Sequence, residues 1–203
     1  MTEKYENIVM LVHPLYDLLF NHMNYLTKNG EITIDELNKA VKKTLNNPRV
    51  KHQLVTTIAE YKQEILKYKA DPSTLVIIYL PTVKETTLDY IFNNISKDFI
   101  PNFKKIFKER LIVSNRFVID EDLSKIPLKK LSKNLKLTAF GEYKNICVTD
   151  YLNNLANQLE ERGFKTRSKI LSRKSYSSSS GRYPGLDHNA RFRPLKRFVR
   201  KPI

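Results

Sequence analysis

The sequence predicts an α/β protein, a three-layer Rossmann-like sandwich with a mostly parallel sheet, followed by an extended basic C-terminal arm. Short apolar runs alternate with amphipathic stretches of helical period, and the connections between the runs are long enough for crossovers. After residue 171 the composition becomes rich in Ser and Arg, which is typical of a linker and a charged arm. We therefore expect a domain over residues 1–171 and a linker with a basic arm over residues 172–203.

In the first half of the chain, three predicted helices lie between two predicted strands. Residues 7–12 form a short apolar run that is typical of a buried strand, and residues 75–80 form an unbroken apolar run, which is typical of a central strand covered on both faces of a sheet. Helices are predicted over residues 16–27, 33–45 and 50–68. The second of these opens with Thr33-Ile34-Asp35-Glu36, a capping box, and we place its end before Asn47-Pro48.

The second half continues the alternation. The predicted elements are helices near residues 85–93 and 102–108, short strands over 111–113 and 117–119, a helical stretch over 123–131 that Pro127 interrupts, a strand over 135–140, a helix over 145–162, and a last strand over 164–171. Gly141 ends the penultimate strand, and Gly163 follows the long helix at the position where glycine commonly closes helices.

Most of the net positive charge lies near the C-terminus. The chain has 36 Lys and Arg against 21 Asp and Glu, a net charge of +15. Residues 164–203 hold twelve of the cations, seven of them Arg, against the single acid Asp187, so they carry +11 and the rest of the chain carries +4.

The arm is predicted to bind RNA or DNA. Arg and Lys neutralise phosphates and release counterions, and exposed aromatic rings among them stack on unpaired bases. The predicted nucleic-acid-binding residues are Arg173, Lys174, Arg182, Tyr183, Arg191, Phe192, Arg193, Lys196, Arg197, Phe198, Arg200 and Lys201. Three alternatives stay open for this segment: an acidic protein surface, an anionic lipid surface, or a solubility tail without a partner.

Several classes of site are not indicated by the sequence. Cys147 is the single cysteine, so an internal disulfide is impossible, and the four histidines do not show zinc-site spacing. Glycine-rich phosphate loops and the Gly-x-Ser-x-Gly elbow are missing, and we expect no cofactor and no metal. Asp120-Glu121-Asp122 could bind Mg²⁺, although such a run more often caps a helix.

No segment of the sequence predicts export or a membrane span. The N-terminal residues lack the features of a secretory signal, and no apolar run approaches the ~20 residues that cross a bilayer. We expect an intracellular protein, cytoplasmic or packaged in a particle.

A candidate site follows from the predicted sheet, because open α/β sheets bind ligands at the carboxyl ends of their strands. That rule selects His13 and Asp17, Thr82 and Lys84, and Glu142, Tyr143 and Cys147. A thiol at the start of a helix has its pKa lowered by the helix dipole. The alternatives are that Cys147 is a small buried core residue and that His13 is a strand-end residue hydrogen-bonded to backbone.

The stretch from Leu137 to Gly163, a strand ending in Gly141 and then Cys147-Val148 opening a helix, resembles the nucleophile region of isochorismatase-like cysteine hydrolases. The resemblance implies a Rossmann-like fold and Cys147 as nucleophile. In that family an Asp directly follows the first strand, where this chain has His13, and Asp17 lies four residues further on. The basic residues nearest to the family's lysine are Lys108 and Arg110.

The sequence therefore favours a non-enzymatic, nucleic-acid-associated protein whose α/β body docks on a larger ribonucleoprotein or nucleoprotein assembly. The texture of the arm resembles the extensions of ribosomal and other ribonucleoprotein subunits. The first alternative is a cysteine hydrolase of a small amide-type substrate. The second alternative is a scaffold or virion component that uses its body for protein contacts.

Overall fold

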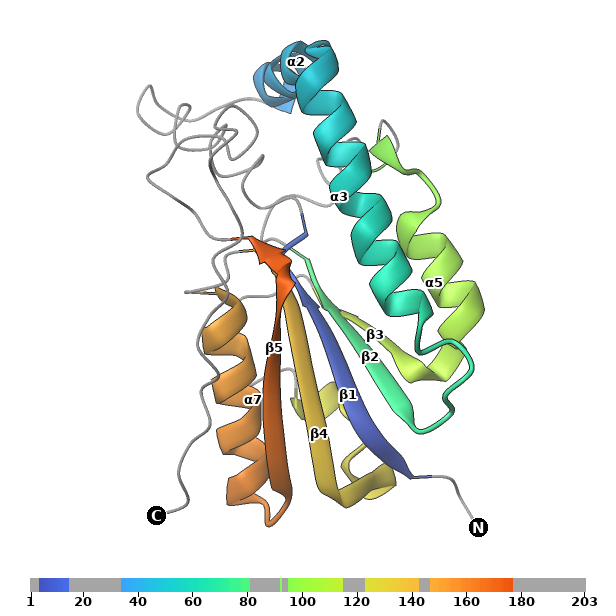
Figure 1. Ribbon diagram of the computed structural model, residues 1–203, viewed down its shortest axis with the longest axis vertical. Coiled ribbons are helices and arrows are strands. Elements are labelled where there is room, and N and C mark those ends of the chain that lie inside the picture. The colour runs from blue at the N-terminus through green and yellow to red at the C-terminus, as the bar shows by residue number, and fades with distance from the viewer. Residues whose placement is uncertain are drawn as a thin grey trace.

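Five parallel strands form one sheet (Figure 1). The computed structural model describes residues 4–14, 34–80, 92, 95–114, 123–142 and 147–176. The strands are β1 (Tyr5–Val12), β2 (Thr74–Tyr79), β3 (Leu111–Ser114), β4 (Leu131–Glu142) and β5 (Lys165–Tyr176). Their order is β3-β2-β1-β4-β5, and every neighbouring pair is parallel. The predicted Rossmann-like α/β fold is confirmed.

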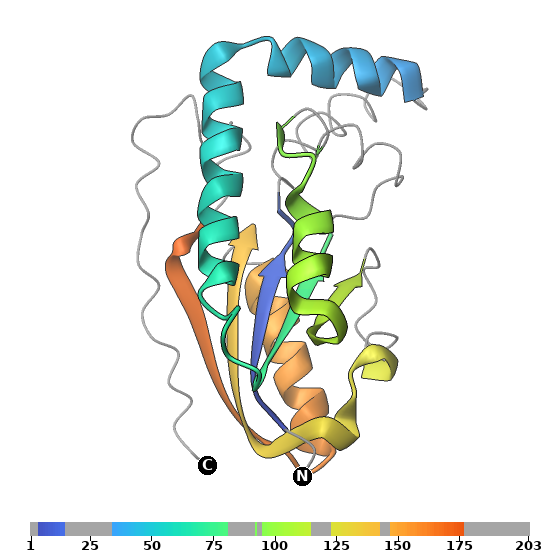
Figure 2. The same ribbon diagram turned by 90° about the vertical axis from the view of Figure 1, so that its right-hand side faces the viewer.

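Helices lie on both sides of this sheet (Figures 1 and 2). On one side are α3 (Pro48–Leu66) and α5 (Phe99–Phe107), and on the other is α7 (Thr149–Glu161). A further helix, α2 (Ile34–Leu45), precedes α3 and lies beyond the end of the sheet. Its acidic first turn and basic last turn complement the helix dipole. The result is the predicted three-layer sandwich.

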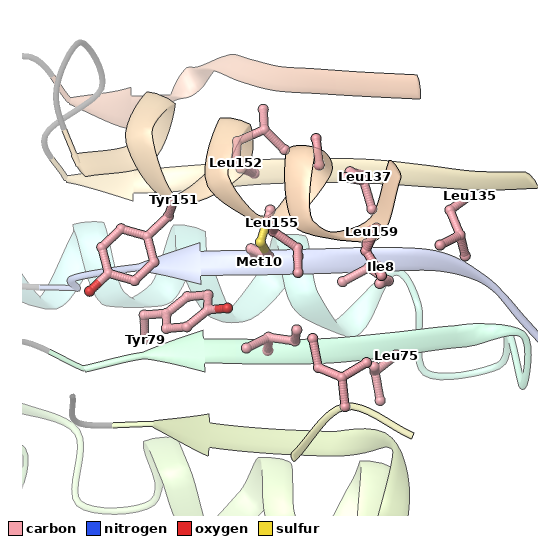
Figure 3. Close-up of a cluster of buried hydrophobic side chains, with 14 of the residues drawn as sticks. Ile8, Met10, Leu75, Tyr79, Leu135, Leu137, Tyr151, Leu152, Leu155 and Leu159 are labelled. Carbon is pink, nitrogen blue, oxygen red and sulfur yellow. The ribbon is translucent and has the colours of Figure 1, made fainter. Parts of the chain in front are cut away.

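Alternate residues of the central strands point to opposite layers, so the sheet has a core on each face. On the α7 side, Ile8 and Met10 of β1 pack with Leu152, Leu155 and Leu159 (Figure 3). The spacings of three and four residues place these three leucines on one stripe of α7. Each is at most 3% exposed, so the helix is anchored to the sheet mainly by apolar burial.

The core on the other side is built from aromatic rings. Val9 and Leu11 of β1 face a column of Phe99, Phe103 and Phe107 along α5. The ring centroids of Phe99 and Phe103 lie 5.0 Å apart at 73°, an edge-to-face arrangement that aromatic pairs prefer. The apolar stretches of β1 and β2 are thereby explained, because both faces of each strand are covered there.

Two of the predicted helices differ from the structure for identifiable reasons. The helix predicted from residue 50 begins at Pro48, where proline is tolerated because the first N–H groups need no intrahelical partner. Asn47 caps it, since its Oδ1 accepts the N–H of Arg49 at 3.1 Å. The single helix predicted over 123–131 is instead two 3-10 turns, Leu123–Lys125 and Leu128–Lys130, because Pro127 separates them.

The last strand is longer than predicted. We expected it to end at residue 171, but β5 continues to Tyr176 and includes Arg173 and Lys174 in its backbone. The predicted elements at 16–27 and 117–119, and all of 85–93 except Phe92, lie outside the described residues. So does residue 177 onward.

Candidate functional site

The topology marks one place on the sheet where ligands bind in folds of this kind. From β1 the chain passes to β2 through α2 and α3, whereas from β4 it passes to β5 through α7 on the opposite side. The strand order therefore reverses between β1 and β4, and the crevice outside their carboxyl ends is the topological switch point. Val12 and Gly141 are paired at this position.

His13, directly after β1, is fully buried at the switch point. Its backbone N–H donates to the Tyr79 carbonyl at 2.7 Å, and its backbone φ is +48°. The ring Nε2 lies 3.3 Å from the Tyr151 hydroxyl, a buried hydrogen-bonding pair. Burial lowers the pKa of His13 from 6.5 to about 4, so its imidazole is neutral near pH 7.

Tyr79 and Tyr151 complete an aromatic cluster with His13. Tyr79 ends β2, Tyr151 lies in the first turn of α7, and their ring centroids are 4.5 Å apart (Figure 3). The rings of His13 and Tyr151 meet edge to face, 5.1 Å apart. All three side chains are at most 3% exposed, so they form a buried, packed cluster between β1, β2 and α7.

Glu142, at the end of β4, contacts the other layer. The Tyr61 hydroxyl of α3 donates to its Oε1 at 3.2 Å, and the Tyr61 ring packs on Phe140. Glu142 is 5% exposed, and the tyrosine partner satisfies part of its hydrogen-bonding capacity inside the protein. The recorded partners of His13 and Glu142 thus lie in different helical layers.

Cys147 is buried and lies two residues before the first residue of α7. It belongs to the core cluster on the α7 side, together with Val148 and Tyr151. This environment agrees with the alternative of a small core residue. A nucleophilic thiol would need access to a substrate, and 9% of the Cys147 surface is exposed.

Arg110, one of the two basic residues nearest to the family's lysine, performs a structural task. It precedes β3, at the amino edge of the sheet, which is opposite to the switch point. Its Nη1 donates to the Asp71 and Thr74 carbonyls at 2.6 and 3.2 Å, and its Nη2 donates to the Lys69 carbonyl at 3.0 Å. The guanidinium thereby fixes the turn between α3 and β2.

Other predicted site residues lie outside the described part of the chain. These are Asp17, Thr82, Lys84, Tyr143 and the acids at 120–122, together with Arg182, Tyr183, Arg191, Phe192, Arg193, Lys196, Arg197, Phe198, Arg200 and Lys201. Within the described residues, no group of three His, Cys, Asp or Glu side chains could hold a metal ion. None of the helices that the structure describes has the length and apolarity to span a bilayer.

A second candidate surface is basic and lies on the outer half of the sheet. Lys165, Arg167 and Lys169 alternate along β5, and Lys136 lies beside Arg167 on β4. All four side chains are exposed. Alternation places them on the same face, so β5 presents a row of cations rather than a core-facing stripe.

Comparison with known proteins found no similar protein. No protein-family model, curated protein or solved structure matches this chain. The candidate sites are therefore judged on their own geometry.

Sequence reasoning missed the tyrosines of the switch point and the basic face of the sheet. Tyr61, Tyr79 and Tyr151 come from three elements that are brought together only by tertiary packing. A signal for the basic face was available, since Lys165, Arg167 and Lys169 follow the two-residue period of a strand.

Proposed function

We propose that this protein is a non-enzymatic nucleic-acid-associated protein whose α/β body docks on a larger assembly and whose basic C-terminal segment contacts phosphates. The supporting observation is the continuity of charge between β5 and the arm. Residues 165–176 of β5 contain five cations and no acid, and residues 177–203 contain seven cations and one acid. The basic segment is therefore rooted in the sheet rather than separate from it.

A polyanion is the partner that this charge pattern suits best. Each Lys or Arg that meets a phosphate releases counterions, so affinity accumulates along a basic segment without any sequence readout. Tyr183, Phe192 and Phe198 add rings that can stack on unpaired bases. Lipid and acidic protein surfaces have no bases, so stacking of these rings on bases would distinguish nucleic acid from those two partners.

The packing at the switch point supports a body without catalysis. His13 and Glu142 are both buried, and each has a tyrosine hydroxyl as a partner. Catalysis by Cys147 would require an accessible thiol with a base in hydrogen-bond reach of it. The hydrolase remains the alternative proposal, and the reactivity of Cys147 tests it.

The test is deletion of residues 177–203, which leaves β5 whole. Binding of a fluorescein-labelled 30-nucleotide RNA and of a DNA duplex is measured by anisotropy, with circular dichroism to confirm that the shortened chain is folded. We expect the deletion to weaken binding of both probes by at least about tenfold at ~0.1 M salt. Equal affinity of the full and shortened chains would refute the role of the arm.

A further inference from the structure

The outer half of the sheet carries a basic sheet face, which we define by six neighbouring positions. Asn134, Lys136 and Thr138 of β4 are paired with Lys165, Arg167 and Lys169 of β5, in that order. Paired residues of parallel strands point to the same side, so the six side chains form two adjacent rows. Five of them are exposed and Thr138 is half-buried.

The register shows which side of the sheet these residues occupy. Further along β4, Phe140 continues the row of Lys136 and Thr138 and packs in the core beneath α3 and α5. The intervening residue Thr166 points the other way, because its hydroxyl donates to Glu160 of α7 at 2.5 Å. The basic sheet face is therefore on the α3 side, where exposure shows that α3 and α5 leave the amino-terminal parts of β4 and β5 uncovered (Figures 1 and 2).

The cations on this face are not neutralised by the rest of the described domain. None of the six positions is an acid, and among the described residues the recorded ion pair joins Glu64 of α3 to Lys67, which directly follows that helix. On the same row toward the centre of the sheet, Asn7 contacts Asp71, whose carboxylate accepts the Ser73 and Thr74 hydroxyls. The four positive charges of the face are free to attract an external anion.

We propose that the basic sheet face is a second phosphate-contacting surface, and that its occupant is the sugar-phosphate backbone of the nucleic acid that the arm holds. This inference rests on the proposed function. The four cations of the face are held on strands of the sheet, and the arm follows β5 directly in the sequence. The six positions include no aromatic side chain, so the face contacts phosphates without stacking on or reading bases.

Protection of the sheet edge is the competing explanation for the β5 charges. Charged side chains on an edge strand discourage pairing with other chains. That role is served by either sign of charge, whereas phosphate binding requires cations. Lys136 also lies on the inner strand β4, where edge protection gives no reason for a cation.

The test uses the full chain and the quadruple variant Lys136→Gln, Lys165→Gln, Arg167→Gln and Lys169→Gln. Its matched control neutralises four exposed lysines of α3, α5 and the turn after α3: Lys51→Gln, Lys69→Gln, Lys104→Gln and Lys105→Gln. Dissociation constants for a 20-base-pair DNA duplex are measured between 50 and 200 mM salt. Each lost contact to duplex phosphate lowers the magnitude of the log–log salt slope by ~0.9, so the face variant should lose ~3.6.

The outcomes separate this inference from the proposed function. If the wild-type protein binds the duplex and the face variant behaves like the control, the inference is wrong while the proposed function stands. If the wild-type protein binds neither duplex nor RNA, the proposed function is wrong. A variant with Glu at the three β5 positions keeps the edge charged, and its retained binding would also contradict the inference. If the face variant instead loses affinity for phosphatidylserine vesicles while its affinity for the duplex is unchanged, the face binds a lipid surface and the inference is wrong.

Discussion

Gly141 of β4 lies so close to Val12 of β1 that a side chain at position 141 has no room. An added Cβ would overlap the Val12 carbonyl oxygen and lie 2.9 Å from the Val12 carbonyl carbon and nitrogen. The backbone φ of Gly141 is +128°, in a region that other residues rarely adopt. The two central strands meet at the switch point because position 141 is glycine.

The change Gly141→Ala should lower the free energy of unfolding by roughly 3 kcal/mol or more, because the clash adds to the backbone strain. The measurement is a urea titration followed by circular dichroism. Gly163→Ala is the matched control: its φ is +78°, but the nearest atom to an added Cβ is Lys133 Nζ at 4.0 Å. That variant should lose about 1 kcal/mol. Equal losses would contradict the close approach of β1 and β4.

Acid should destabilise the fold through His13. Its pKa is about 4 when folded and 6.5 when unfolded, so the unfolded chain binds the proton first as pH falls. Stability is complete above pH 6.5 and declines down to about pH 4, by ~3 kcal/mol at most for this group. His13→Asn tolerates the positive φ and should flatten this decline in urea titrations. If the His13→Asn variant loses stability in acid as the wild-type protein does, His13 does not cause that loss. The control is His52→Asn, at an exposed position.

Removal of the Arg110 guanidinium should loosen the turn between α3 and β2. Arg110→Lys keeps the charge but cannot donate to several carbonyls at once, and it leaves the Phe107 ring, 5.2 Å from the guanidinium carbon, without its partner. We expect a loss of about 1–3 kcal/mol in the free energy of unfolding. Lys104→Ala, at an exposed position of α5, should change it by less than ~0.5 kcal/mol. If Arg110→Lys left the free energy of unfolding unchanged, the turn would be stable without these hydrogen bonds.

Cys147 should react slowly with a thiol reagent while the protein is folded. Because the side chain is buried, we expect the rate with dithionitrobenzoate at pH 7.5 to be at least about 100-fold below that of the urea-unfolded chain. Fast reaction of the folded protein, with a rate profile that indicates a lowered thiol pKa, would instead support the cysteine-hydrolase alternative. Cys147→Ser should leave nucleic-acid affinity unchanged.

Patterns carried by consecutive residues could be predicted, and relationships across the fold could not. The apolar runs within β1 and β2 were enough to predict two buried strands. The end of β5 was misplaced because residues 172–176 are almost all polar in sequence, so Arg173 and Lys174 resembled a linker. The pair of His13 and Tyr151 is separated by 138 positions and depends on how α7 packs on the sheet. No local pattern contains that information.

The charge distribution also changed in meaning once β5 was placed. From the sequence, the twelve cations after residue 163 formed one tail. Five of them belong to a strand of the folded domain, and the three whose side chains the structure describes, Lys165, Arg167 and Lys169, are exposed on its surface. The basic segment therefore has a part inside the sheet and an arm that follows it in the sequence, and the variants above measure their contributions separately.

The most direct test of nucleic-acid association is the salt dependence of binding by the full-length protein. Dissociation constants for the 30-nucleotide RNA and the 20-base-pair duplex are measured from 50 to 200 mM salt. We expect log affinity to fall against log salt with a slope steeper than about −4 for the duplex, because many phosphate contacts release counterions. Absence of binding to both probes, or an affinity that salt does not change, would contradict it.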